Sequence, residues 1–313
     1  MSILLSVTGF DATRWMEALL AAAPGETVVL RPASAADESI DYAVVWRQPP
    51  GVLSNLPNLR AVFSLGAGVD HILQDKTLPD VPILRIVADD LTHRMSEYVV
   101  WRVLDHHRRG MTYRAQQAAR IWNERRQPAA SEIEVGVLGL GELGRDAASK
   151  LGTLGFRVSG WSRRPKTVEG VECFHGEAGL DAVLSRADIL VVLLPLTAET
   201  RGMIDDGFLS RLKRETPLGT PSLVNAGRGG LQKDSAILRA LNDGRLMEAS
   251  LDVFEREPLA PDSPLWRHPR VFVTPHAAAS SDPAALAPII MSQIAAHRRG
   301  EALGNVVDRG AGY

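Results

Sequence analysis

Short apolar runs alternate with amphipathic stretches along the whole chain. In the first hundred residues the runs are rich in Val, Ile and Leu, and turn-forming residues separate them. The runs expected to form strands are SILLSVT (2–8), TVVLRP (27–32), YAVVW (42–46), RAVFSLG (60–66) and PILRIV (82–87). Asp11 stands where it would cap a helix that continues to Ala23. Such alternation predicts a parallel sheet covered on both faces.

A second alternation follows a long helical stretch. Residues 95–119 contain no proline and many good helix formers, so one long helix is expected to lead into a second domain, with a linker around Pro128. The strands expected after it are 133–138, 156–161, 171–174, 188–193, 221–226, 248–252 and 271–274. One more helix is expected at 283–299, before a polar tail. The pattern predicts an α/β chain of two Rossmann-like or flavodoxin-like domains with parallel sheets.

Composition narrows the class of protein. A length of 313 residues suits two domains, and 45% hydrophobic with 23% charged residues is typical of a globular protein. A net charge of −2 gives no electrostatic reason to expect nucleic acid or a membrane as a partner. The single cysteine, Cys173, excludes an intramolecular disulfide and fits a reducing compartment. Since neither a leader pattern nor a membrane-length apolar run is present, a cytoplasmic protein is expected, and we expect no metal site.

Three glycines follow the first strand of the second domain. Gly139, Gly141 and Gly144 have the spacing G-x-G-x-x-G, with Glu142 and Leu143 between them. In a dinucleotide site the first glycine makes the tight turn, the second lets the pyrophosphate approach the backbone, and the third lets helix and strand pack closely. The alternative is an ordinary glycine-rich turn. Because a strand precedes the motif and a helix follows it, the context favours cofactor binding.

The end of the next strand carries basic residues. NAD-specific sites place a carboxylate about 20 positions after the glycines. Here Ser162, Arg163 and Arg164 stand in that place, with Lys166 just beyond, and the first carboxylate is Glu169. Arginine matches a ribose 2′-phosphate in charge and geometry, whereas the alternative is a solvated basic turn. We therefore expect NADP(H) to be preferred, with NAD(H) as the other possibility.

Further along, charged residues follow apolar runs in three segments. Arg228 lies in SLVNAGRGG, Asp252 and Glu257 lie in LDVFEREPL, and His276 lies in VFVTPHAAAS. Ligands of an open parallel sheet bind beyond the carboxyl ends of its strands, so these side chains could converge there. Each also has a structural alternative, as a surface arginine, a loop or a packed histidine. Their joint occurrence downstream of a dinucleotide motif favours a catalytic site.

These motifs resemble the D-isomer-specific 2-hydroxyacid dehydrogenases, and within them the glyoxylate/hydroxypyruvate reductases. The similar segments are VVWRQPP, FSLGAGVD, LGLGELG, WSRRPK, NAGRGG, LDVFEREPL, SPLWRHPRVFVTPH and VVDRGAGY, which span nearly the whole chain. The resemblance implies an NADPH-dependent oxidoreductase that reduces small 2-keto acids, glyoxylate to glycolate and hydroxypyruvate to D-glycerate. The sequence departs from the family pattern in that it lacks the acidic residue that binds the ribose.

The resemblance also implies roles for the charged residues. His276 would give a proton to the carbonyl oxygen as a hydride reaches the keto carbon. Glu257 would bind the other ring nitrogen and orient the imidazole. Arg228 would hold the substrate carboxylate and carbonyl. Asp252 matches the family residue that binds the nicotinamide carboxamide.

The first domain would complete the substrate site. Gly66, Ala67 and Gly68 would offer backbone N–H groups to a carboxylate, although the residues alone would suggest a plain turn. Trp46 and Arg47 match residues that roof a small pocket in the subgroup, and core packing is the alternative for the tryptophan.

Domain boundaries follow from the resemblance too. It implies a discontinuous substrate domain, 1–98 and 278–313, around a dinucleotide-binding Rossmann domain, 99–277. By the same analogy the long helix suggests a homodimer. Two other functions stay open: a dehydrogenase for a bulkier 2-keto acid, and a dinucleotide-sensing binding protein of the same fold.

Overall fold

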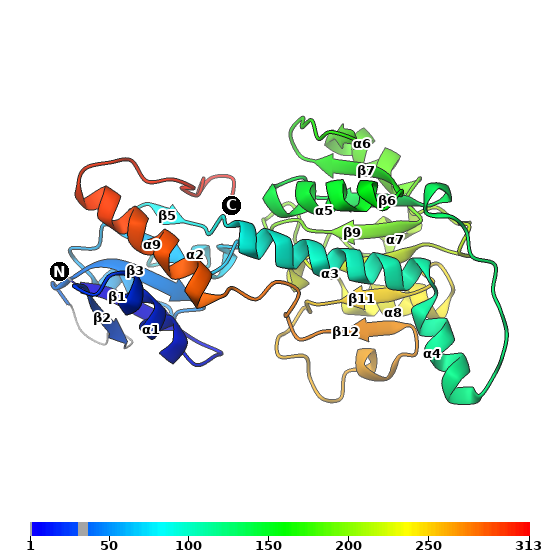
Figure 1. The fold of residues 1–313 in the computed structure, drawn as a ribbon, viewed down its shortest axis with the longest axis horizontal. Coiled ribbons are helices and arrows are strands. Elements are labelled where there is room, and N and C mark those ends of the chain that lie inside the picture. The colour runs from blue at the N-terminus through cyan, green and yellow to red at the C-terminus, as the bar shows by residue number, and fades with distance from the viewer. Residues whose placement is uncertain (1, 31–36) are drawn as a thin grey trace. The chain divides into compact units, whose positions relative to one another are not determined.

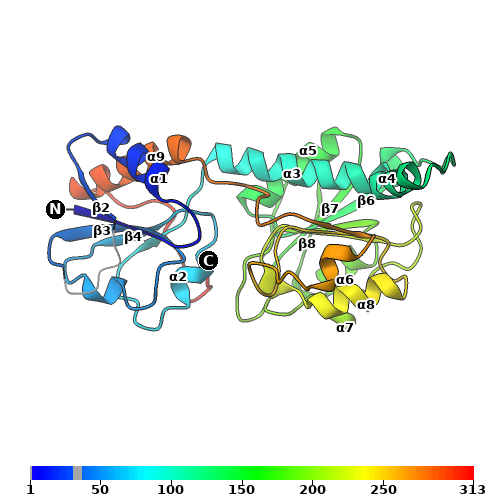
Figure 2. The same cartoon turned by 90° about the horizontal axis from the view of Figure 1, so that it is seen from below.

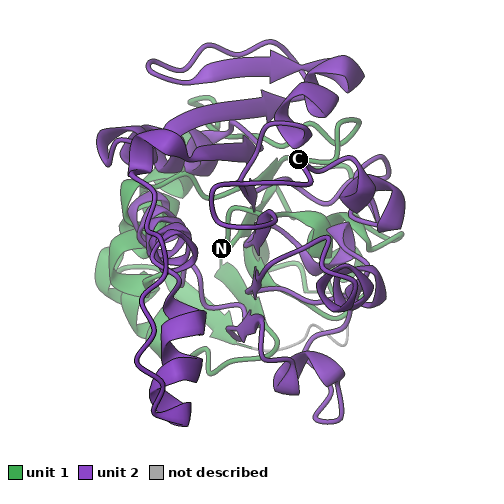
Figure 3. Ribbon diagram, turned by 90° about the vertical axis from the view of Figure 1, so that its right-hand side faces the viewer, with its two compact units in different colours: residues 1–91, 281–313 green, residues 92–280 purple. Residues whose placement is uncertain are grey.

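The computed structural model describes residues 2–30 and 37–313 and divides into two compact units. Unit 1 comprises Met1–Leu91 and Ser281–Tyr313, and unit 2 comprises Thr92–Ser280, shown in green and purple in Figure 3. Residues 92–98 and 278–280, which the sequence places in the substrate domain, fall in unit 2. The reason is packing, because Met95, Tyr98 and Ala278 are buried in a core of that unit.

Unit 1 is built on a five-stranded parallel sheet in the order β2-β1-β3-β4-β5. The strands are β1 (Ser2–Val7), β2 (Thr27–Leu30), β3 (Ile40–Trp46), β4 (Ala61–Ser64) and β5 (Ile83–Leu84). The order reverses between β1 and β3, as in flavodoxin-like sheets, where ligands bind at the reversal. The last two residues of the expected TVVLRP strand, 31 and 32, lie outside the described part of the chain.

Helices cover both faces of this sheet. Helices α1 (Thr13–Ala22) and α9 (Pro283–Arg298) pack against each other on one face, and α2 (Asp70–Leu73) lies on the other (Figure 2). The side chain of Asp11 accepts the backbone N–H of Thr13 at 3.0 Å, so it bonds to the first turn of α1 although Ala12 occupies the cap position.

The end of the chain is more than the polar tail that the sequence suggests. The backbone N–H of Val307 donates to the carbonyl of Ile83 at 2.8 Å, and Leu84 forms an antiparallel bridge with Val306. Val307 is buried in the same core as Ile83. The C-terminal segment therefore pairs with β5 at the edge of the sheet, which protects that edge.

Unit 2 contains a seven-stranded parallel sheet in the order β12-β11-β10-β9-β6-β7-β8. The strands are β6 (Glu134–Leu138), β7 (Arg157–Ser162), β8 (Glu172–His175), β9 (Ile189–Val192), β10 (Ser222–Asn225), β11 (Ala249–Leu251) and β12 (Val271–Val273). The order reverses between β6 and β9, which is the Rossmann arrangement. A dinucleotide is expected beyond the carboxyl ends of the strands at that point.

Two apolar cores lie on the two faces of this sheet. Helices α3 (Asp89–His107) and α5 (Glu142–Thr153) cover one face, and α6 (Gly176–Leu184), α7 (Asp206–Ser210) and α8 (Asp234–Asn242) cover the other (Figures 1 and 2). Strands β6, β9 and β10 are buried from end to end. Burial on both faces explains why these strands read as continuous apolar runs in the sequence.

The single helix expected over 95–119 is wrong in two respects. It begins at Asp89, and a break separates α3 from α4 (Gly110–Ala119), where Arg109 has a left-handed backbone with φ of 57°. A side chain at Gly110 would meet the carboxylate of Asp105, to which both Arg102 and Arg114 donate. The break thus lets one carboxylate bind an arginine from each helix, a tertiary contact that helical periodicity does not register.

Among the described residues, none of the helices combines the length and the apolar character that crossing a membrane requires. In the same part of the chain, His, Cys, Asp and Glu nowhere gather in a group of three that could hold a metal ion.

Candidate active site

The glycine turn after β6 has three different steric environments. Gly139 has φ of +105°, and a Cβ there would lie 2.8 Å from the carbonyl oxygen of Leu193. A Cβ on Gly144 would lie 1.8 Å from the carbonyl oxygen of Gly139, so the helix must approach the strand without a side chain. A Cβ on Gly141 would meet nothing within 4 Å. Two glycines are therefore required by the fold itself, and the middle one faces open space.

The residues between these glycines begin α5. Glu142 is its first residue and pairs with Arg145, while Leu143 packs against the core of that face. The helix has 12 residues, and Gly141 stands directly before its first residue. The partial positive charge of the helix N-terminus therefore faces the open space at Gly141.

The basic segment after β7 lies next to the glycine turn. The backbone N–H of Gly139 donates to the carbonyl of Trp161 at 2.8 Å, which ties the turn to the end of β7. One residue on, the hydroxyl of Ser162 donates to the carbonyl of Arg164 at 2.8 Å and folds the segment back. The Arg163 guanidinium is exposed and lies 3.7 Å from the carboxylate of Glu199. Glu199 follows β9, and the sequence reasoning did not include it.

A buried amide network shapes the loop that carries Arg228. The side-chain N–H of Asn225 donates to Gln232 Oε1 at 2.7 Å, and Gln232 donates to the carbonyl of Val253 at 3.1 Å. Gly229 allows the closest approach, since a Cβ there would lie 1.8 Å from the carbonyl oxygen of Phe254. Arg228 itself is half-buried at the end of this loop.

His276 and Glu257 are in direct contact. Nδ1 of His276 lies 2.8 Å from Oε2 of Glu257, and the other carboxylate oxygen accepts the backbone N–H of Phe254 at 3.2 Å. The His276 side chain is 29% exposed, and its backbone is left-handed with φ of 54°. The Glu257 carboxylate is thus held by the Phe254 N–H through one oxygen while its other oxygen contacts the His276 ring.

Asp252 braces the loop that carries His276. The residue is 1% exposed, and its carboxylate accepts the Thr274 hydroxyl at 2.6 Å and the backbone N–H groups of Ala277 and Ala278 at 2.8 and 3.0 Å. The Thr274 hydroxyl also lies 2.9 Å from that of Tyr98 on α3. Burial, with the nearby Asp252 carboxylate, raises the pKa of Tyr98 to about 12. The sequence analysis did not identify Tyr98 or Thr274. Only Thr274 has a signal in the sequence, because it stands directly before the Pro-His pair.

Three strands bring the charged residues to one edge of the sheet. Arg228, Asp252 and His276 follow β10, β11 and β12, which are adjacent and parallel. The glycine turn follows β6 at that same edge, so the predicted dinucleotide and acid/base residues share the carboxyl side of unit 2.

In unit 1, the predicted substrate residues surround one tryptophan. A Cβ on Gly66 would lie 2.5 Å from the ring of Trp46, and that ring contacts the His71 ring in a tilted arrangement with centroids 4.7 Å apart. Arg47 is exposed, with φ of 47°, and its guanidinium lies 5.9 Å from the same ring. The backbone N–H of Gly66 donates to the Ser64 hydroxyl at 3.2 Å.

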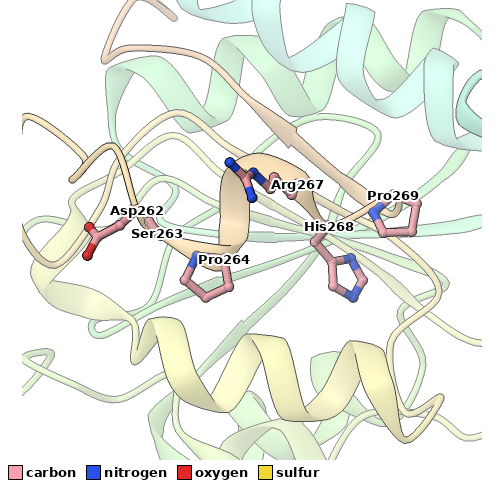
Figure 4. Close-up of a pocket in the computed structure, with 6 residues that line it drawn as sticks. All are labelled: Asp262, Ser263, Pro264, Arg267, His268 and Pro269. Atoms are coloured by element: carbon pink, nitrogen blue, oxygen red, sulfur yellow. The ribbon is translucent and has the colours of Figure 1, made fainter.

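The lining of a surface pocket of unit 2 contains none of the predicted site residues. Its volume is about 510 Å³, and Asp262, Ser263, Pro264, Arg267, His268 and Pro269 line it (Figure 4). Pro269 comes before β12, so this side of the pocket is at the amino end of the strand, whereas His276 follows the carboxyl end. The side chains of Asp262 and Arg267 point in different directions in Figure 4. Position and chemistry favour the carboxyl edge as the active site.

Comparison with known proteins agrees with this geometry. The model of the D-isomer specific 2-hydroxyacid dehydrogenase NAD binding domain matches residues 100–278. The chain belongs to the D-isomer-specific 2-hydroxyacid dehydrogenases. The fold and family predicted from the sequence are confirmed, and the dehydrogenase is an oxidoreductase acting on CH–OH groups.

Solved members of the family match the whole dehydrogenase. The NADPH-dependent glyoxylate/hydroxypyruvate reductase of Sinorhizobium meliloti, in complex with NADP and sulfate, is 47% identical, with 100% of each chain covered and a TM-score of 0.94. A 2-hydroxyacid dehydrogenase of Rhizobium etli, with NADP, HEPES and tartaric acid, is 45% identical (100% and 99% covered, TM-score 0.92). One of Xanthobacter autotrophicus, with NADPH and MES, is 40% identical (100% and 99% covered, TM-score 0.93).

Proposed function

We propose that this dehydrogenase reduces glyoxylate to glycolate and hydroxypyruvate to D-glycerate with NADPH. The observation that carries the proposal is the 2.8 Å contact between His276 Nδ1 and Glu257 Oε2 at the carboxyl edge of a Rossmann sheet. The relatives from Sinorhizobium, Rhizobium and Xanthobacter, solved with NADP or NADPH, support the choice of cofactor, and the first of them supports the substrates.

His276 serves as the proton donor in this proposal. The Glu257 carboxylate can only accept, so the proton of this hydrogen bond belongs to Nδ1. A protonated ring then presents Nε2–H, which donates to the carbonyl oxygen of the substrate as negative charge develops there. The product is a hydroxyl group, and the ring, now neutral, regains its proton from water. Glu257 stabilises the charged ring and keeps it from rotating.

Residues of unit 2 fit a phosphorylated dinucleotide. The backbone at Gly141 is open, and the N-terminus of α5 beside it attracts the pyrophosphate, with Glu142 and Leu143 beginning that helix. Ser162, Arg163 and Arg164 would bind the ribose 2′-phosphate. Asp252 would face the nicotinamide with the part of its side chain that its hydrogen bonds to the His276 loop leave accessible. When bound, NADPH supplies the hydride for the keto carbon.

The substrate carboxylate is assigned to Arg228 in unit 2. A guanidinium binds a carboxylate through two parallel hydrogen bonds, which aligns the keto group as well as attracting it. In unit 1, the N–H groups of Ala67 and Gly68 are the remaining backbone donors of the glycine loop. Trp46 and Arg47 are assigned to the roof of a small pocket.

Substitution of His276 tests the proposal directly. His276→Ala should lower kcat with glyoxylate by roughly 10²–10⁴-fold while the Kd of NADPH stays nearly the same, because a general acid is lost. Glu257→Gln keeps the shape of the side chain and should also lower kcat. Unchanged turnover in His276→Ala would remove this residue from the mechanism.

Substitution of Arg163 tests the cofactor assignment. Arg163→Ala should weaken NADPH far more than NADH, since NADH lacks the phosphate. Equal losses for the two cofactors would contradict the assignment.

The two other functions predict different kinetics. A higher kcat/KM for phenylpyruvate than for glyoxylate would favour the dehydrogenase of a bulkier acid. NADPH binding without turnover over a panel of 2-keto acids would favour the dinucleotide-sensing protein.

We also propose a homodimer in the cytoplasm. Trp122 is fully exposed and Ile121 is 55% exposed in the segment after α4, and Trp101 on α3 is 48% exposed. Apolar side chains in such a stretch are typical of a surface that another subunit covers. Light scattering should give twice the 33.9 kDa of one chain, and Trp122→Ala should weaken the dimer.

The single cysteine, Cys173, supports a reducing compartment, which cell fractionation tests.

A further inference from the structure

The backbone at His276 adopts a conformation that needs support. Its φ of 54° lies in the left-handed region, which costs a non-glycine residue free energy unless neighbouring bonds hold it. The direction of the imidazole depends on this conformation, because the ring follows the Cα–Cβ bond. Whatever fixes the backbone of 274–278 therefore also fixes the proton donor.

Asp252 provides that support from two sides. Its backbone carbonyl accepts the N–H of His276 at 2.8 Å. Its carboxylate accepts the next two N–H groups along the chain, those of Ala277 and Ala278. Three consecutive N–H groups of the loop thus donate to Asp252. The geometry of these hydrogen bonds requires a single rotamer of the Asp252 side chain.

Two hydroxyl groups hold that rotamer. Thr274 Oγ1 lies 2.6 Å from Asp252 Oδ1, and Tyr98 Oη lies 2.9 Å from Thr274 Oγ1. The carboxylate accepts only, so the one hydroxyl proton of Thr274 points to Asp252 and Tyr98 must donate to Thr274. Tyr98 is 6% exposed on α3, which contacts β11 through the Arg102–Ser250 hydrogen bond and β12 through the Trp101 and Phe272 rings. The chain of bonds therefore has a rigid origin.

We propose that Tyr98 and Thr274 are positioning residues that hold the proton donor His276 through the carboxylate of Asp252. The inference rests on the proposed function, in which His276 is the acid. Neither hydroxyl is assigned to the substrate or the cofactor. With its pKa raised to about 12 by burial, Tyr98 keeps its proton, and so its role as donor, over the pH range in which the enzyme is assayed.

Three variants test the chain of hydroxyls. Thr274→Val removes the hydroxyl at nearly constant volume, Tyr98→Phe removes only the first donor, and Thr274→Ser restores the hydroxyl. With glyoxylate and NADPH, kcat should fall roughly tenfold in Thr274→Val and a few-fold in Tyr98→Phe. Thr274→Ser should stay within about twofold of the parent protein. The KM of glyoxylate and the Kd of NADPH, from fluorescence titration, should change by less than about twofold.

Tyr42→Phe is the matched control. Tyr42 is also a buried tyrosine, and its hydroxyl lies 2.9 Å from Nδ1 of His297 in unit 1. Both Tyr→Phe variants should lose similar thermal stability, but only Tyr98→Phe should lose kcat. Equal kcat in the two variants would reduce Tyr98 to a structural role and overturn its part of the inference.

A double-mutant cycle with His276→Ala separates positioning from general damage. If Thr274 acts through His276, Thr274→Val should have no further effect on the residual turnover of His276→Ala. A second tenfold loss in the double variant would overturn the inference. So would a loss of NADPH affinity at constant kcat, which would assign the network to the nicotinamide instead. If His276→Ala itself keeps full turnover, the proposed function fails, whereas full kcat in Thr274→Val alone defeats only this inference.

Discussion

Each unit has glycines at the carboxyl end of a strand in a parallel sheet, yet the two sets do different work. In unit 2, Gly139 and Gly144 let backbone approach backbone, and between them Gly141 leaves open surface. In unit 1, Gly66 makes room for the ring of Trp46, and its N–H is bound by a hydroxyl. The comparison teaches that the same residue type in the same place can leave open surface or make room for a neighbouring side chain. What the missing Cβ would touch distinguishes the two cases.

Buried tyrosines extend the comparison. Tyr98 in unit 2 bonds to a hydroxyl that leads to the loop of His276, whereas Tyr42 in unit 1 bonds to His297 on the last helix. Burial raises the pKa of both phenols. The two bonds have equal length, so only their partners separate a site role from a structural one.

The largest effect is expected at Gly144. In Gly144→Ala the new Cβ would lie 1.8 Å from a backbone oxygen, which cannot move without displacing β6 or α5. We expect the free energy of unfolding to fall by about 3 kcal/mol or more, measured by urea denaturation. A loss below about 0.5 kcal/mol would mean that the helix and strand do not need this close approach.

The next effect is a pH dependence of stability. The folded-state pKa of Tyr98 is raised to about 12 from an unfolded value near 10, so its stabilisation is complete below about pH 10 and is lost as the pH rises through 12. Between these pH limits the free energy of unfolding of the parent protein should fall by about 2–3 kcal/mol relative to that of Tyr98→Phe. Urea denaturation of both proteins from pH 9 to 12 measures it, and Tyr42→Phe should show the same sign. A constant difference would mean that Tyr98 is not desolvated.

A smaller loss is expected in unit 1. In Gly66→Ala the new methyl group would overlap the ring of Trp46, which can move but is held by its contact with the His71 ring. Stability should fall by about 1–2 kcal/mol, and in a Trp46→Leu background the same change should cost less than about 0.5 kcal/mol. Equal losses in both backgrounds would show that Gly66 is required for its backbone and not for the ring.

The smallest effect distinguishes binding from folding. Gly141→Ala should leave the unfolding free energy within about 0.5 kcal/mol, because nothing lies within 4 Å of the new Cβ. NADPH affinity should fall about tenfold, or about 1.4 kcal/mol, if the pyrophosphate contacts this backbone. Gly152→Ala is the control, since this position on α5 is equally open and lies about three turns from Gly141. Equal NADPH affinity in both variants would detach the cofactor from Gly141.

Local patterns in the sequence were sufficient to predict much of the fold. The strands of unit 2 were predicted close to their observed positions, and most clearly β6, β9 and β10, because burial on both faces makes each of these a continuous apolar run. The break at Arg109 was missed because it depends on Asp105 reaching arginines on both sides of it. The pairing of Val306 and Val307 with β5 was missed for a similar reason, since a partner more than two hundred residues away leaves no local pattern.

The sequence by itself determined the fold class, because strands and helices alternate along it, and the family, because its motifs are specific; the contact of Glu257 with His276 was implied only by the resemblance. Tertiary structure alone decided what braces the histidine loop and which glycine leaves open surface. Tyr98 lies on a helix and its partner follows a strand 176 positions later, so their contact exists only once α3 packs on the sheet. Steric room at a glycine likewise belongs to its neighbours in space, and the order of residues along the chain does not contain it.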